Sequence, residues 1–169
     1  VLAPAWPGLE DSVADVRRDP AGLSAVSLGD VLDRYAKIIR GLSEPPVIVG
    51  HCYGGLICQL LGDQGLGAAA VAIAPIPPRG FLVRSFFCRL ALLSVAISSS
   101  GKHGIAHLTF TQFRRKFCNS LPESNARHIY DAQVIPAPRR VVLQTALAGF
   151  TLSSAATVNF GNSRRPPLL

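Results

Sequence analysis

The stretch Val47-Ile48-Val49-Gly50-His51-Cys52-Tyr53-Gly54-Gly55 decides how this sequence folds. It follows two prolines, and three β-branched residues then run up to a glycine. Such a run, without polar alternation, predicts a strand that is buried on both faces. The apolar stretch 56–61 comes next, bounded by glycines at 62 and 65, and predicts a helix. The segment therefore predicts a strand that passes into a helix through a turn of small residues.

The sequence on either side of this stretch predicts a parallel sheet. Upstream, Ser27 is placed to cap a helix with Asp30 three residues later, and apolar residues recur at helical spacing up to residue 42. The short runs 1–3 and 69–74 predict strands before and after. The order strand, helix, strand, helix, strand predicts an α/β fold with about three parallel strands and flanking helices.

The second half of the chain has a helical, amphipathic pattern and predicts no strand. Helices are expected over 83–97, 111–119, 122–134 and 138–150. The apolar pair Leu168-Leu169 follows a Pro-Pro, as Val47-Ile48 does, and position 1 is not Met. We therefore expect a core segment over 1–80, a helical lid inserted over 81–160, and over 161–169 the start of a core strand cut from a longer chain.

Composition and charge exclude several classes of protein. The chain is 49% hydrophobic, as folded domains are. Its net charge of +7 is unevenly distributed, with the positive excess after residue 63, because all but two of the acidic residues lie in the first 63 positions. The basic pairs are scattered and lack interleaved aromatic residues, so no nucleic-acid partner is expected. The most apolar stretch, 81–97, is interrupted by Arg84 and Arg89 and is too short to span a bilayer.

The four cysteines predict separate thiols. No two stand in a Cys-x-x-Cys pattern or at zinc-ligand spacing with histidines, so no metal or other cofactor is expected. Without a leader in the sequence, a reducing cytoplasm is the expected compartment. Cys58, Cys88 and Cys118 are expected to be small core residues.

Cys52 stands at the centre of a Gly-x-Cys-x-Gly motif between the predicted strand and helix. In a nucleophile elbow, the central residue occupies a strained turn, and the flanking glycines avoid a clash of Cβ atoms with neighbouring backbone. The positive end of the helix dipole would stabilise a thiolate and an incoming oxyanion. The alternative is a glycine-rich connection that holds an inert, buried cysteine.

Taken together, the motifs of the chain resemble those of α/β-hydrolase-fold proteins of the lysophospholipase-like, lid-bearing kind. Ala3-Pro4-Ala5-Trp6-Pro7-Gly8 resembles the loop after a core strand, Pro46 to Gly55 the elbow, and Ala74 to Gly80 the entry to the lid. Segments around Gln112-Phe113, 136–138 and 157–160 resemble the lid itself.

The resemblance implies acyl transfer by a nucleophile, a histidine base, an acidic partner and an oxyanion hole. It places Cys52 at the nucleophile and the Tyr53 backbone N–H at one oxyanion donor, with elbow glycines Gly50, Gly54 and Gly55. The family usually has Ser where Cys52 stands, although the dienelactone hydrolases have Cys. Ala74 stands where such relatives often have Asp. The acid and the histidine are expected beyond Leu169, and the second oxyanion donor upstream of Val1.

Other residues near the motif have simpler expected roles. His51 and Trp6 are expected to line or support the substrate pocket, whereas His103, His107 and His128 are expected at the surface of the lid.

The leading hypothesis is a hydrolase of a small ester, lactone or lysophospholipid-like acyl substrate. The alternative is a catalytically inactive member that acts at most by binding, and a third is a basic interaction module whose nucleic-acid affinity falls steeply with salt. The sequence does not indicate the oligomeric state.

Overall fold

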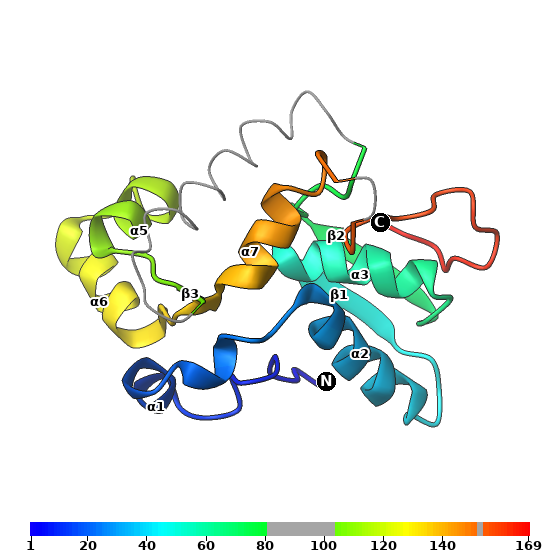
Figure 1. Cartoon of the computed structure of the whole chain (residues 1–169), viewed down its shortest axis with the longest axis horizontal. Coiled ribbons are helices and arrows are strands. Elements are labelled where there is room, and N and C mark those ends of the chain that lie inside the picture. Colours follow the sequence, from blue (N-terminus) through cyan, green and yellow to red (C-terminus); the bar gives the residue numbers. More distant parts are fainter. Residues whose placement is uncertain (81–103, 152–153) are drawn as a thin grey trace.

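A computed structural model describes residues 1–80, 104–151 and 154–169 of the chain, so the helix expected over 83–97 lies outside the described residues (Figure 1). In the described ranges, the elements in chain order are α1 (Val13–Arg18), the short 3₁₀ helix η1 (Ala21–Leu23), α2 (Leu28–Arg40), β1 (Val47–His51), α3 (Tyr53–Asp63), β2 (Ala69–Ile73), β3 (Ile105–Ala106), α5 (Phe110–Phe117), α6 (Glu123–Gln133), β4 (Ala137–Pro138) and α7 (Arg139–Ala146).

The central sheet is parallel, and this confirms the predicted α/β fold. β1 pairs with β2 in a register that sets Val47 opposite Ala69 and His51 opposite Ile73. α3 connects the two strands and lies across one of their faces (Figure 1). The end of the chain extends the sheet beyond β2, because Leu168 pairs in parallel with Ala70.

Two expectations about the sheet are wrong. Residues 1–3 form no strand, and Val1 and Leu2 are exposed. Val47 and Val49, which are 60% and 63% exposed, show that β1 is not buried on both faces. Alternate side chains of a strand point to opposite faces of the sheet. Within the described residues, α3 covers the face opposite to the one that bears Val47 and Val49.

α2 forms as its capping signal predicts. Ser27 accepts a hydrogen bond from the Asp30 N–H, and the Asp30 carboxylate accepts one from the Ser27 N–H at 2.8 Å. This capping box satisfies two donors that the helix itself leaves unpaired. The apolar face of α2 packs with α3 and α7 in the largest core cluster, which includes Leu28, Val31, Leu56, Leu61 and Val141.

The helices α5, α6 and α7 confirm the helical prediction for the described part of the second half. α6 matches closely, whereas α7 ends at Ala146 instead of residue 150. β3 and β4 form a two-residue antiparallel pair that was not predicted. A pair this short is too brief to show the alternation by which strands are recognised in a sequence.

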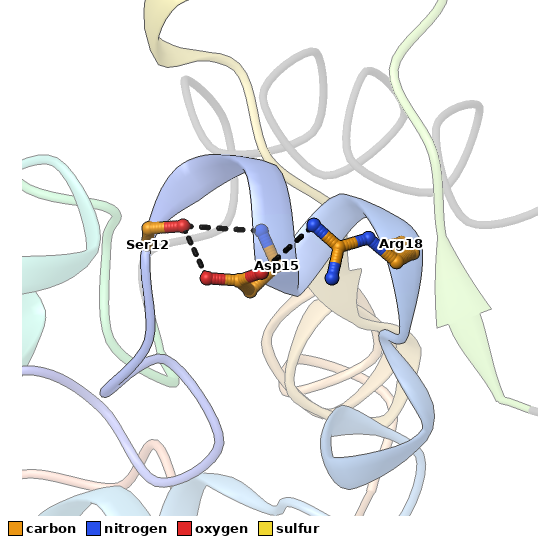
Figure 2. A network of polar contacts seen from close by, with 3 residues as sticks. All are labelled: Ser12, Asp15 and Arg18. Atoms are coloured by element: carbon orange, nitrogen blue, oxygen red, sulfur yellow. Dashed lines mark hydrogen bonds and ion pairs between the residues drawn. The ribbon is translucent and has the colours of Figure 1, made fainter.

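α1 was not predicted, although its capping signal is visible in the sequence. The Asp15 N–H donates to the Ser12 hydroxyl at 3.2 Å, and Arg18 forms an ion pair with Asp15 at 3.0 Å (Figure 2). The neighbouring Arg17 points elsewhere: its guanidinium donates to the carbonyl oxygens of Tyr130, Asp131 and Val134. It thereby joins α1 to the carboxyl end of α6, where a basic side chain can donate to the last carbonyl groups of the helix.

The segment before the C-terminal strand pairing is fixed to the end of α3. Asp63 accepts a hydrogen bond from the Asn159 N–H at 2.9 Å, and its backbone carbonyl accepts one from the Asn162 side chain at 2.7 Å. The chain then reaches β2, where the Ala70 N–H donates to the Pro167 carbonyl at 2.8 Å. In the described part of the chain, no helix has the length and apolar character needed to cross a membrane.

Candidate active site

Cys52 occupies a strained backbone turn between β1 and α3. Its φ is 54° and its ψ is −112°, in a region that residues with a side chain rarely adopt. The Cys52 N–H donates to the Ile73 carbonyl at 3.0 Å, and its carbonyl accepts from the N–H groups of Gly55 and Ile76, both at 3.1 Å. Hydrogen bonds to the neighbouring strand and to the first turn of α3 therefore hold this conformation.

Glycine is required on one side of this turn for the reason that the motif predicts. A Cβ atom on Gly50 would lie 2.2 Å from the Gly54 carbonyl oxygen and 2.7 Å from the Cys58 Sγ. Neither distance is tolerable, and the first involves backbone, which cannot rotate away. Gly50 therefore lets β1 and α3 approach each other closely.

On the other side of the turn, the steric expectation for Gly54 is wrong. A Cβ on Gly54 would meet nothing within 4 Å. The crowded position is Gly55, where a Cβ would lie 2.8 Å from the Pro75 Cβ. The contact arises because the segment after β2 crosses over the first turn of α3. The motif therefore predicts correctly that a side chain does not fit at Gly50. After Cys52, the crowded position is Gly55, one residue later than the motif predicts.

Tyr53 is the first residue of α3 and has a side chain that is partly buried in the core. The N–H groups of a first helical turn point out of the amino end of the helix, on the side of Cys52. The Tyr53 ring meets the Trp6 ring edge to face, with centroids 6.0 Å apart, and its hydroxyl lies 3.2 Å from the Thr145 Oγ1. Trp6 thus supports the residue that follows Cys52.

His51 and Trp6 both line a cavity of about 790 Å³ between the N-terminal segment, α2, β1 and α3. Gly50, Gly54 and Cys58 also line it, and Cys52 does not. His51 is exposed and belongs to the set of alternate β1 residues that includes Val47 and Val49. The cavity therefore lies beside the turn and is lined by residues on either side of Cys52, without Cys52 itself.

The other cysteines differ from Cys52 in burial. Cys58 is 1% exposed, and burial raises the pKa of its thiol to about 11. Cys118 is also buried, and Cys58 and Cys118 are free thiols as predicted, whereas Cys52 is partly exposed. Cys88 lies outside the described residues. Cys52 is therefore the most accessible of the three described thiols.

Of the described histidines, only His51 adjoins Cys52 in the sequence. His107 and His128 are exposed, as expected, and His128 belongs to α6, which lies with α5 at the end of the molecule away from α3 (Figure 1). His103 lies outside the described residues. In the described ranges, no three His, Cys, Asp or Glu side chains are grouped as ligands for a metal ion.

Thr145 is the residue near the turn that the sequence did not indicate. It is 1% exposed on α7, and its hydroxyl lies 3.0 Å from the carbonyl oxygens of Val141 and Val142 as well as close to Tyr53. A polar residue within an apolar helical stretch suggests that its side chain forms a buried hydrogen bond. The sequence alone does not identify the partner, because Tyr53 lies 92 positions away.

The geometry thus combines a parallel strand, a positive-φ Cys, a helix that starts at once, and a glycine without room for a side chain. The family model for the alpha/beta hydrolase family matches the chain over residues 1–169. The chain belongs to the alpha/beta hydrolase family. Searches among curated proteins and among solved structures found no match. Members of the alpha/beta hydrolase family are generally hydrolytic enzymes, so membership suggests hydrolase-type activity on a small-molecule substrate.

Proposed function

We propose that this alpha/beta hydrolase cleaves a small acyl substrate, an ester, lactone or lysophospholipid-like molecule, with Cys52 as its nucleophile. The observation that carries the proposal is the φ of 54° at Cys52, between a parallel strand and a helix. A non-glycine residue in such a conformation costs about 1–3 kcal/mol, and such positions cluster at functional sites. The turn presents the Cys52 side chain at the amino end of α3.

The proposed chemistry follows from that position. The Cys52 thiolate attacks the substrate carbonyl and a C–S bond forms as the acyl C–O bond breaks. The alkoxide takes a proton from water and leaves as the alcohol. Water then hydrolyses the thioester, which releases the acid and restores the thiol. The amino end of α3 supports both proposed steps, because its dipole favours a thiolate and the Tyr53 N–H would stabilise the oxyanion. We assign no base to His107 or His128, since both are exposed on other elements.

The resemblance to lysophospholipase-like proteins supports a lid formed by residues 81–160. Its described helices α5 and α6 pack on each other, and α7 contacts α2. α7 also reaches the turn through Thr145 and Tyr53. A lid in this place would cover the side of the elbow on which an acyl chain binds, and it would set how large a substrate Cys52 can reach.

Acylation with p-nitrophenyl acetate tests the proposed nucleophile. We expect the 169-residue chain to release one equivalent of p-nitrophenolate per chain and to carry an acetyl group on the peptide that contains Cys52. Cys52→Ala should abolish both, whereas Cys118→Ala, which removes a buried thiol elsewhere, should abolish neither. Acetylation that persists unchanged in Cys52→Ala would refute the assignment.

Ala74 favours a second candidate, a member of the family that has lost catalysis and acts by binding. It directly follows β2, beside the nucleophile turn, where the resemblance places an Asp. A thiol-directed ester probe distinguishes the two candidates. Stoichiometric labelling of Cys52 that increases with pH counts against the binding module, and a chain whose folded state leaves Cys52 unlabelled supports it.

A further inference from the structure

The hydroxyl groups of Tyr53 and Thr145 form a hydrogen bond between the proposed nucleophile turn and α7. The Thr145 hydroxyl has a single hydrogen, which the carbonyl oxygens of Val141 and Val142, each 3.0 Å away, can accept. The Tyr53 hydroxyl lies 3.2 Å from the same Thr145 oxygen, and either hydroxyl can be the donor of this hydrogen bond. Thr145 is almost fully buried, so solvent does not compete for this contact.

The same stretch of α7 is attached to a second helix. The side chain of Gln144 accepts a hydrogen bond from the Leu28 N–H at 2.8 Å, at the amino end of α2. Consecutive residues of α7 therefore contact the amino ends of two core helices. Since α2 also packs on α3, α7 cannot shift without breaking one of these contacts or moving Tyr53.

Tyr53 is held from two directions. On one side its ring meets Trp6 edge to face, and on the other its hydroxyl meets Thr145. The backbone N–H of the same residue belongs to the amino end of α3, beside Cys52. The two side-chain contacts therefore restrain the Tyr53 Cα at the start of α3, and with it the peptide that carries this N–H.

We propose that Tyr53 is a positioning residue, whose hydroxyl, anchored on Thr145 of α7, aims its own backbone N–H at the oxyanion formed when Cys52 attacks a carbonyl. This inference rests on the proposed function, because it concerns the same thiol and the same reaction. It adds that the helical part after residue 104 takes part in building the oxyanion site and does more than cover it. Substitutions on α7 should therefore change acyl chemistry without touching Cys52.

Two reagents separate positioning of the oxyanion donor from general loosening of the turn. p-Nitrophenyl acetate forms a tetrahedral oxyanion when a thiolate attacks it. Iodoacetamide alkylates the same thiolate by displacing iodide, and no oxyanion forms on its carbonyl. A misaimed N–H slows the first reaction alone, whereas a changed thiolate fraction or a changed exposure of Cys52 alters both.

The experiment measures both rate constants at Cys52 in the 169-residue chain by mass spectrometry of the Cys52 peptide. In Tyr53→Phe, which keeps the ring against Trp6, we expect acylation to fall by about tenfold and alkylation to stay within about twofold of wild type. Thr145→Val should behave like Tyr53→Phe, and Thr145→Ser, which keeps a hydroxyl, should retain wild-type acylation. Tyr130→Phe is the matched control, because it removes a tyrosine hydroxyl that donates to the Leu108 carbonyl on another element.

The outcomes distinguish this inference from the proposed function. If wild-type Cys52 is alkylated but never acylated, the proposed function fails. If wild-type Cys52 is acylated and Tyr53→Phe and Thr145→Val keep the same ratio of acylation to alkylation, the positioning role is overturned. Should Tyr53→Phe fold poorly, the comparison of Thr145→Val with Thr145→Ser decides the question by the same ratio.

Discussion

Cys52 and Ala74 occupy equivalent places in the sheet, and both have a positive φ, 54° and 42°. Each directly follows its strand, and the last residues of the two strands, His51 and Ile73, are register partners. Within the described residues, no other non-glycine residue has a positive φ. The carboxyl edge of the sheet therefore concentrates the backbone strain at two adjacent positions, of which one is the proposed nucleophile.

This strain at Ala74 can be relieved by glycine. Ala74→Gly should raise the free energy of unfolding by up to about 1 kcal/mol, because glycine adopts a positive φ without a Cβ penalty. Ala72→Gly, inside β2, is the matched control and should lower stability by about 1 kcal/mol. Urea unfolding followed by fluorescence measures both changes. An Ala74→Gly chain as destabilised as Ala72→Gly would contradict the idea of local strain.

Gly50 and Gly54, two of the three elbow glycines, should respond oppositely to the same substitution. Gly50→Ala must displace the Gly54 carbonyl and should cost at least about 2 kcal/mol of stability. Gly54→Ala finds open space and should gain up to about 1 kcal/mol, since alanine favours a helix. Thermal unfolding of the two variants checks the difference in sign. Equal losses in both would show that Gly54 is needed for packing after all.

The parts of the fold that the sequence predicts are those set by neighbouring residues. Three features depend on contacts between residues a few positions apart, and their sequence patterns therefore predict them. They are the capping box of Ser27 and Asp30, the Pro-bounded strand before Gly50 and the helix after Cys52. The same reasoning could have found α1, whose cap at Ser12 has an acidic residue three positions later.

Contacts between distant residues could not be predicted in this way. The exposure of Val49 depends on what covers the second face of β1, and no property of the strand itself reports that. Gly55 is crowded by Pro75, which another segment brings over α3. The bond between Tyr53 and Thr145 depends likewise on how α7 packs. The sequence therefore indicates the proposed nucleophile, and the structure supplies its surroundings.

The buried Cys58 should make the protein less stable at alkaline pH. Burial raises the pKa of its thiol from 9.0 to about 11, so the folded state holds the proton more tightly than the unfolded state does. This contribution is fully present below pH 9 and is lost as the pH rises through about 11, at a total of about 2–3 kcal/mol.

Urea unfolding at a series of pH values between these limits should show the decline in the free energy of unfolding, and Cys58→Ala should make this decline shallower. The pKa of Tyr35 is also raised by burial, so part of the decline remains in that variant. A decline of unchanged slope in Cys58→Ala would assign the effect to other groups.

Arg17 and Arg18 are adjacent arginines on α1 with different partners, so they form a matched pair. Arg17 donates to three carbonyl oxygens at the carboxyl end of α6, more than 110 positions away, whereas Arg18 pairs with Asp15 one turn earlier at the surface. Arg17→Gln should lower the free energy of unfolding by about 1 kcal/mol, because charge-assisted bonds to carbonyl oxygens at the end of α6 are lost. Arg18→Gln should change it by less than about 0.5 kcal/mol, as exposed ion pairs contribute little.

Hydrogen exchange adds a local test, since the backbone amides at the carboxyl end of α6 should exchange faster in Arg17→Gln alone. If the two variants were equally stable and equally protected there, α6 would not depend on α1, and the two elements would be joined by the remaining core contacts.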